Sequence, residues 1–367
     1  MPHLTVLPNN EFGADSTPTY LFDYAEEYRT NAPEAGRSWF REARYGLAVR
    51  YGLHSLIGKG DQIQYIDKIP VQQYELLKNK FTAVNFDPME IAECAIAGGF
   101  RYIDFCARGA DGFCLFQSAY SDFSSVTAPA QRDLVAEMAS VCEYHGLGLC
   151  LHYSHGQDWR HPHAPNQDLG GPFARPNYPQ PDRAYHTGAE HQLDVYLDFV
   201  SAQIQELLNS YGPIAAICLD GIAGPLYSSP EKFHCSDLYR LIRHLQPQVL
   251  VSYQQGLTGE EDFFAVNKTP PGLDAAKAEQ GFVNIMMNKP LEIRDSLTPD
   301  AWGYHAELAG NHLTPDAVWK LLEKAALFPA NLTLNTNLMP DGSLDLEDIN
   351  TIIAVGSKIE KHGFPKT

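Results

Sequence analysis

The feature that most constrains the fold is an alternation of short apolar runs and amphipathic segments from Trp39 onward. Each apolar run ends in a polar residue and shows no regular alternation, which is typical of a strand buried on both faces. We expect strands at residues 45–51, 101–107, 148–153, 214–220, 249–253, 282–287 and 332–335. We expect helices at residues 88–97, 133–145, 190–208, 236–245 and 346–359, and one that begins where Thr314 precedes Pro315 and Asp316.

Strand and helix units that recur about eight times predict a parallel sheet covered by helices. An open, doubly wound sheet would usually show a glycine-rich phosphate turn after its first strand, but the Gly98-Gly99 pair precedes a strand. The sequence therefore predicts an α/β fold of the (β/α)8, TIM-like barrel type. No linker or composition shift indicates a second domain, so we expect an irregular N-terminal segment at 1–38 and one barrel domain at 39–367.

Composition and charge narrow the range of partners. With 44% hydrophobic and 20% charged residues the chain is typical of globular proteins, and its net charge of −18 disfavours nucleic acids and anionic membrane surfaces. No apolar run is long enough to span a bilayer, and the first residues do not resemble a secretory signal. We expect a cytoplasmic protein, unless a leader has been removed, with a small neutral molecule as substrate; the sequence leaves a homo-oligomer open.

The seven cysteines include no C-x-x-C pair, and several lie in apolar runs. We interpret them as free thiols of the core, which fits a reducing compartment.

In a (β/α)8 barrel the functional groups come from the carboxyl ends of the strands and the loops that follow them. The polar and aromatic residues at these predicted positions are Arg50, Tyr51, His54, Arg108, Asp111, His152, Tyr153, His155, Trp159, Asp220 and Tyr253. Asp220 is the most informative of them, because a carboxylate closes the apolar run IAAICL without a local structural need. The alternative interpretation of Asp220-Gly221 is a helix cap or a loop turn.

Several segments between Trp39 and Ser343 share their order and spacing with one known family. They are YGLAVRYGLHS at 45–55, DGFCLF at 111–116, YS and DW within 153–159, NSYGPI leading to LDG at 209–221, WGY at 302–304 and NLTLN at 331–335. Together they resemble the α-L-fucosidases of glycoside hydrolase family 29. The resemblance implies a retaining exo-glycosidase barrel that uses Asp220 as nucleophile and needs no metal or cofactor. It also implies that the β-sandwich which many members carry at the C-terminus is missing.

Retaining hydrolysis needs a second carboxylate about 5–5.5 Å from the nucleophile, which acts first as acid and then as base. The resemblance places this group in a variable loop, for which Glu260 and Glu279 are our candidates beside Glu261 and Glu292. A carboxylate of this kind is more often a solvated surface group, which is the alternative interpretation of each of the four. Trp302 and Tyr153 are expected to stack on a sugar ring, with core packing as the alternative for Trp302.

The departures from the family pattern predict an altered sugar specificity. Arg50-Tyr51-Gly52 stands where relatives usually have His-Trp-Gly or His-Tyr-Gly, Gly109-Ala110 replaces a pair of histidines, and Gln62-Ile63 replaces a Glu-Trp pair. The missing groups hydrogen-bond the hydroxyls of fucose, and their loss costs about 10⁴-fold or more in discrimination. An unpaired guanidinium is costly to bury, so we also expect Arg50 to point into the pocket and to pair with a carboxylate or an anionic ligand group.

Two alternatives to a glycosidase remain from the sequence. The inherited pocket could act on a non-sugar metabolite by proton transfer or by stabilising a cation, or the protein could be a non-hydrolytic pseudoenzyme. The histidines of HYSHGQDWRHPH, namely His152, His155, His161 and His163, invite a metal site. No H-E-x-x-H motif accompanies them, so we expect no metal and assign them to ligand contact or to loop hydrogen bonds.

Overall fold

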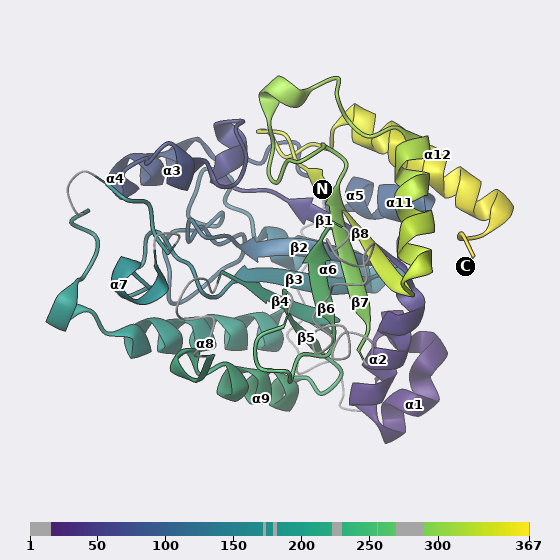
Figure 1. Cartoon of the computed structure of the whole chain (residues 1–367), viewed down its shortest axis with the longest axis horizontal. Coiled ribbons are helices and arrows are strands. Elements are labelled where there is room, and N and C mark those ends of the chain that lie inside the picture. Colours follow the sequence, from purple (N-terminus) through teal and green to yellow (C-terminus); the bar gives the residue numbers. More distant parts are fainter. Residues whose placement is uncertain are drawn as a thin grey trace, which may run out of the picture.

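The computed structural model of the chain describes residues 16–171, 174–178, 182–221, 230–254, 256–268 and 289–366. Its strands form one eight-stranded sheet in the order β5-β4-β3-β2-β1-β8-β7-β6, with every paired neighbour parallel. Between β5 and β6, the Asp262 amide donates to the Val251 carbonyl at 2.8 Å, and the Ala265 amide donates to the Gln254 carbonyl at 2.7 Å. These bonds close the sheet, so the predicted TIM-like barrel is confirmed (Figure 1).

The strands are β1 (Tyr45–Arg50), β2 (Tyr102–Arg108), β3 (Gly148–Ser154), β4 (Ala216–Asp220), β5 (Leu250–Tyr253), β6 (Phe264–Asn267), β7 (Leu291–Ser296) and β8 (Ala330–Asn337). Six of them match predicted strands, whereas the strand predicted at 282–287 lies outside the described residues. Strands β6 and β7 were not predicted. Their physical signature is weak, because β7 carries Glu292, Arg294 and Asp295 and β6 ends in Asn267.

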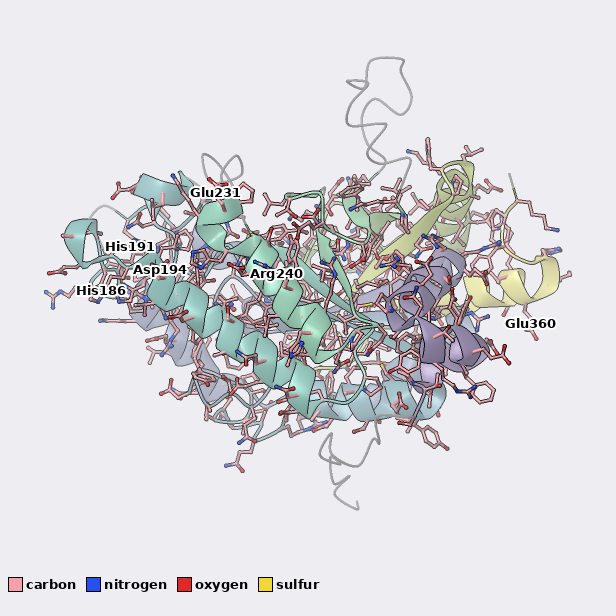
Figure 2. The ribbon with its side chains drawn as sticks, turned by 90° about the horizontal axis from the view of Figure 1, so that it is seen from below. His186, His191, Asp194, Glu231, Arg240 and Glu360 are labelled. Atoms are coloured by element: carbon pink, nitrogen blue, oxygen red, sulfur yellow. The ribbon has the colours of Figure 1, made fainter. Side chains whose placement is uncertain are left out.

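The long helices that cover the barrel are α5 (Pro88–Gly98), α6 (Leu134–His145), α8 (Leu193–Ser210), α9 (Cys235–Leu245), α11 (Pro315–Leu327) and α12 (Leu346–His362). The predicted start of α11 is confirmed, since the Thr314 hydroxyl accepts the Ala317 amide at 3.3 Å. The outer faces of α8 and α9 carry charged residues such as Asp194 and Arg240 (Figure 2). Among the described residues, none of the helices combines the length and the apolar character that a bilayer crossing requires.

Short elements fill the loops. They are the helices α3 (Ile63–Ile66), α4 (Val71–Tyr74) and α7 (Gln167–Gly170) and the 3₁₀ turns Thr19–Tyr24, Leu53–Leu56, Glu75–Lys80, Gly188–Glu190, Pro230–Phe233 and Ala306–Leu308. Figure 1 shows α3, α4 and α7 at one end of the barrel and α1 and α2 at the other. All seven cysteines are free and buried, as predicted.

The expectation of an irregular segment up to residue 38 is wrong where the structure describes it. A 3₁₀ turn is followed by α1 (Ala25–Thr30) and by α2 (Ala32–Ala43), which crosses the predicted boundary. The prolines in this segment do not indicate irregular structure, because two of them stand at helix starts. Pro18 precedes the 3₁₀ turn, and Pro33 lies in the first turn of α2, where the missing amide breaks no helical hydrogen bond.

Helix α2 closes the amino end of the barrel. Phe40 is buried with its ring 4.2 Å from that of Phe263, and Trp39 contacts the backbone of Gly148 where β3 begins. A side chain at Gly148 would collide with the Trp39 indole, which explains the glycine. The opposite end of the barrel, where the strands terminate, is therefore the end at which a ligand can enter.

Candidate functional site

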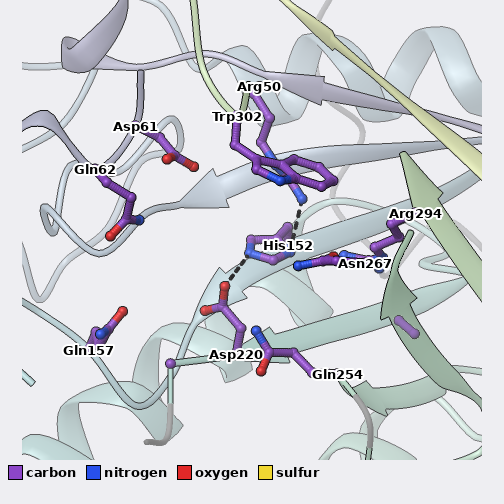
Figure 3. A pocket seen from close by; sticks show the side chains of 12 residues that line it. Arg50, Asp61, Gln62, His152, Gln157, Asp220, Gln254, Asn267, Arg294 and Trp302 are labelled. Atoms are coloured by element: carbon purple, nitrogen blue, oxygen red, sulfur yellow. Dashed lines mark hydrogen bonds and ion pairs between the residues drawn. The ribbon is translucent and has the colours of Figure 1, made fainter. Parts of the chain in front are cut away.

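A cavity of about 310 Å³ opens at the carboxyl ends of the strands (Figure 3). It is lined by Arg50, Asp61, Gln62, His152, Gln157, Asp220, Gly221, Gln254, Ala265, Asn267, Arg294 and Trp302. A narrower branch of about 60 Å³ shares Arg50, Asp61, His152 and Asp220 with it. The size fits a small molecule and the lining is mostly polar, so the cavity suits a ligand with many hydrogen-bonding groups.

Asp220 ends β4 with its carboxylate on the cavity wall. Its Oδ1 accepts the Ser154 hydroxyl at 2.9 Å, and its Oδ2 lies 3.0 Å from Nε2 of His152. The backbone carbonyl of Asp220 accepts the Tyr253 hydroxyl at 2.9 Å. Burial alone would raise the pKa of Asp220, but His152, Ser154 and the charge of Arg50 lower it below its usual value. The result is an ionised carboxylate whose two oxygens are both held in place.

Behind His152, charged groups continue across the barrel interior. Nη2 of Arg50 lies 3.2 Å from Nδ1 of His152 and 3.6 Å from Oδ2 of Asp104. Nη2 of Arg294 lies 3.3 Å from the same Asp104 oxygen. The expectation that Arg50 points into the pocket and pairs with a carboxylate is confirmed. Asp104 itself was not singled out, although a carboxylate inside the apolar run RYIDFCA was the signal that could have found it.

Asp61 faces Asp220 from the other side of the cavity (Figure 3). Its amide donates to the Trp302 carbonyl at 2.9 Å, which fixes the loop that carries it. Burial raises the pKa of Asp61 to about 7, with the negative charge of Asp220 adding to the rise and Arg50 opposing it. No spacing signal in the sequence indicated Asp61, because it lies in a loop whose path only the fold defines.

Several predicted substrate-binding residues do line the two parts of the cavity. Trp302 and Arg50 lie in the wider part, and Tyr51, His54 and Asp111 lie in the narrow branch. Burial raises the pKa of Asp111 to about 6 and, with the charge of Arg50, lowers the pKa of His54 to about 3. The Tyr51 hydroxyl donates to the Pro340 carbonyl at 3.2 Å, so it is already occupied.

Other predicted contact residues line neither part of the cavity; they are Arg108, Tyr153, His155, Trp159 and Tyr253. Arg108 and Asp158 form a fully buried ion pair. The Tyr153 hydroxyl donates to the side-chain carbonyl of Gln203 at 2.7 Å. These side chains pack behind the cavity wall, so their positions do not favour direct contact with a ligand.

Where the structure describes them, the glutamates proposed as acid and base do not lie beside Asp220. Glu260 is exposed and accepts the Ser236 hydroxyl at 3.2 Å on the outside of the barrel, so its predicted catalytic role is not supported. The loop turns outward because the Arg243 guanidinium bonds the Glu260 carbonyl at 2.6 Å and the Asp262 carboxylate at 3.0 Å. Glu261 accepts three backbone amides of its own loop, and Glu292 bonds Tyr102 inside the barrel. Glu279 lies outside the described residues.

The loop after β3 gathers four histidines. The His163 ring lies 4.5 Å from that of His186 and 6.1 and 6.2 Å from those of His161 and His191, and Figure 2 shows His186 and His191 at the periphery of the molecule. In the part of the chain that the structure describes, the one group with metal-compatible spacing is His312, Asp345 and Glu347. It lies at the start of α12 and does not line the cavity.

Comparisons with known proteins agree with this geometry. The alpha-L-fucosidase family model matches residues 18–364. Alpha-L-fucosidase 1 of Arabidopsis thaliana is 28% identical over 180 residues, or 48% of this chain and 30% of the relative, so the match spans under a third of that protein. Tissue alpha-L-fucosidase of Macaca fascicularis is 22% identical over 353 residues, which cover 89% of this chain and 68% of the relative.

Solved structures extend the likeness to the fold. Alpha-L-fucosidase isoenzyme 1 from Paenibacillus thiaminolyticus has a TM-score of 0.78 and 29% identity, covering 91% of this chain and 77% of that chain. Alpha-L-fucosidase AlfC from Lactobacillus casei, solved with the α-L-fucose product, has a TM-score of 0.75 and 23% identity, covering 89% and 98%. The second likeness shows the fold alone.

Proposed function

Because the chain belongs to the alpha-L-fucosidase family, we propose that it is a retaining glycoside hydrolase that uses Asp220 as nucleophile on a glycone other than fucose. The observation that carries the proposal is the ionised Asp220 carboxylate, held at both oxygens by His152 and Ser154 on the wall of a polar cavity. In this mechanism an Asp220 oxygen attacks the anomeric carbon while the bond to the leaving oxygen breaks. Water then hydrolyses the glycosyl-enzyme and frees the carboxylate.

Asp61 is our candidate for the acid and base. A leaving oxygen must receive a proton as its bond to the sugar breaks, and an acid with a pKa near 7 can hold that proton at neutral pH. Two carboxyl groups whose environments separate their pKa values typically divide the roles of acid and nucleophile, and Asp61 and Asp220 are such a pair. In the second half of the reaction, ionised Asp61 would accept a proton from the attacking water.

The altered glycone specificity rests on the narrow branch of the cavity. Gly109 and Ala110 line it, where the family pattern has two histidines that bind fucose hydroxyls. A side-chain atom added at Gly109 would meet only Asp111 Oδ1, at 3.5 Å, so this branch offers space in place of two imidazole donors. We propose that a glycone with a different substituent pattern occupies that space.

We expect aryl α-L-fucoside to be hydrolysed at a trivial rate, because the groups that bind fucose hydroxyls are absent. The measurement is kcat on a panel of aryl glycosides that differ in the sugar, with aryl α-L-fucoside included. A kcat on the fucoside near the enzyme median of about 10 s⁻¹ would show that those contacts were overvalued. Failure of the whole panel would favour the non-sugar or non-hydrolytic alternatives.

The Asp61→Asn variant tests the acid role. On the best glycoside of the panel, we expect kcat/KM to fall by about 10²–10⁴-fold for an alkyl leaving group, which needs a proton. The fall should be much smaller for a nitrophenyl leaving group, which departs as a stable anion. Wild-type activity should decline as pH rises through about 7, where Asp61 loses its proton, and the variant should lack this decline.

The matched control is Glu279→Gln, which alters the remaining candidate of the variable loop. If that variant shows the dependence on the leaving group and Asp61→Asn does not, Glu279 is the acid and our assignment is wrong. Melting curves of both variants separate loss of the proton donor from loss of the fold.

A further inference from the structure

We infer that Arg50 is a positioning residue that fixes the tautomer of His152, with the ring proton on Nε2, and so directs the hydrogen bond from His152 to Asp220. The state of His152 follows from the contacts alone, whereas the kinetic consequence rests on the proposed role of Asp220.

The chemistry of the donors allows one arrangement. A guanidinium has five N–H donors and no acceptor, so the Nδ1 of His152, 3.2 Å from Nη2 of Arg50, must present its lone pair. The ring proton then lies on Nε2, which is 3.0 Å from Oδ2 of Asp220. An ionised carboxylate only accepts, so this second contact requires the same tautomer. Both contacts therefore specify the same tautomer.

Arg50 is itself held in place. It is only 6% exposed at the end of β1, and Asp104 pairs with it from β2. Arg294 on β7 shares the same Asp104 oxygen. Burial opposes ionisation of Asp104, but the charges of Arg294 and Arg50 lower the pKa of its carboxyl below the usual value. A charged Asp104 thus fixes the guanidinium against His152, and Arg294 keeps Asp104 paired if Arg50 is removed.

The groups around His152 are consistent with this tautomer. The ionisable ones are Arg50 from β1, Asp104 from β2, Asp220 from β4 and Arg294 from β7, joined by Asp61 across the cavity. Cys106 and Cys218 flank it on the neighbouring strands, and burial raises both thiol pKa values, that of Cys106 to about 12, so they stay neutral. The opposite tautomer would place an N–H at Nδ1 directly against the Arg50 guanidinium, which has donors only.

Fixing the tautomer orients the nucleophile. With Arg50 in place, Nε2 of His152 presents an N–H donor to Oδ2 of Asp220, and the Ser154 hydroxyl holds Oδ1. Without Arg50, His152 is free to reverse its tautomer, which would turn a lone pair toward Oδ2 and leave that oxygen without its donor.

The experiment combines nitrogen-15 NMR of protein labelled at histidine with kinetics of the same samples at neutral pH. His152 is assigned by its loss in His152→Gln. In the wild type we expect a lone-pair signal for Nδ1 and an N–H signal for Nε2. In Arg50→Met we expect these two signals to move toward each other as the other tautomer becomes populated, and kcat/KM to fall by about 10–10²-fold.

Arg50→Lys and Arg240→Met are the controls. A lysine ammonium is also a donor without an acceptor, so Arg50→Lys should restore the tautomer and much of the activity. Arg240→Met removes an exposed arginine and should change nothing. A wild-type signal with the proton on Nδ1, or His152 nitrogen signals that are unchanged in Arg50→Met, would overturn the inference. The wild-type spectrum decides the tautomer even if Arg50→Met fails to fold.

The two proposals fail separately. If the spectra show the expected tautomers but kcat/KM of Arg50→Met equals that of the wild type, Arg50 positions His152 and the reaction does not depend on it. Whether Asp220 is the nucleophile is decided separately, by the activity of Asp220→Asn.

Discussion

Asp220→Asn is expected to lose at least 10²–10⁴-fold in kcat while its melting temperature stays close to that of the wild type. The amide keeps the shape of the side chain but cannot supply the negative charge that attacks the anomeric carbon. The fold should tolerate it, because the amide oxygen can still accept from His152 and the amide nitrogen can donate to the Ser154 hydroxyl, which can rotate to accept. The measurements are kcat on the best glycoside of the panel and a melting curve.

An external nucleophile distinguishes the role of Asp220 more sharply. In Asp220→Gly, added azide can occupy the vacated space and attack the sugar, which should restore turnover and give a glycosyl azide of inverted configuration. Asp237→Asn, an exposed carboxylate on α9, is the matched control and should behave like the wild type. Full activity of Asp220→Asn on the true substrate would make Asp220 a structural residue and would remove the main support for a glycosidase.

The position of Asp220 could be predicted because a barrel strand is apolar until it reaches the active end. The run IAAICL leads into Asp220, and the structure ends β4 at that residue. The same reasoning could not find β7, whose Glu292 and Arg294 belong to the polar interior of the barrel and erase the apolar signal. Asp61 could not be predicted for a different reason. It lies in a loop, and only the three-dimensional path of the whole chain brings that loop to the cavity.

Which strand residues face the cavity depends on a register that the sequence did not fix. Successive side chains of a strand point to opposite faces, so on β3 the inward positions of His152 and Ser154 turn Tyr153 toward the helices. The prediction that His152 and Tyr153 both contact a ligand could therefore hold for only one of the two. On β2 the register shifts between Cys106 and Arg108, an irregularity that removes Arg108 from the inward series.

Arg108 was predicted to bind substrate, and its surroundings instead predict a large effect on stability. It is fully buried with Asp158 as its ion-pair partner, Nη1 donates to the Ser154 carbonyl at 2.9 Å, and the guanidinium carbon lies 4.7 Å from the centre of the Tyr153 ring.

We expect Arg108→Met to lower the free energy of unfolding by about 3–5 kcal/mol, because Asp158 is left buried without its counter-charge. Urea unfolding measures the loss, and the double variant Arg108→Met with Asp158→Asn should recover part of it, since no charge is then buried alone. The amides of Arg160 and His161, which donate to Asp158 at 2.8 and 2.7 Å, would still find an acceptor in the asparagine.

A ligand contact would give the opposite pattern: Arg108→Met would unfold like the wild type, KM would rise, and Asp158→Asn would rescue nothing. Ser154 connects Arg108 to the nucleophile, because its carbonyl accepts from Arg108 and its hydroxyl donates to the Asp220 carboxylate. A stable Arg108→Met variant that loses kcat alone would therefore show that Arg108 holds Ser154 in place.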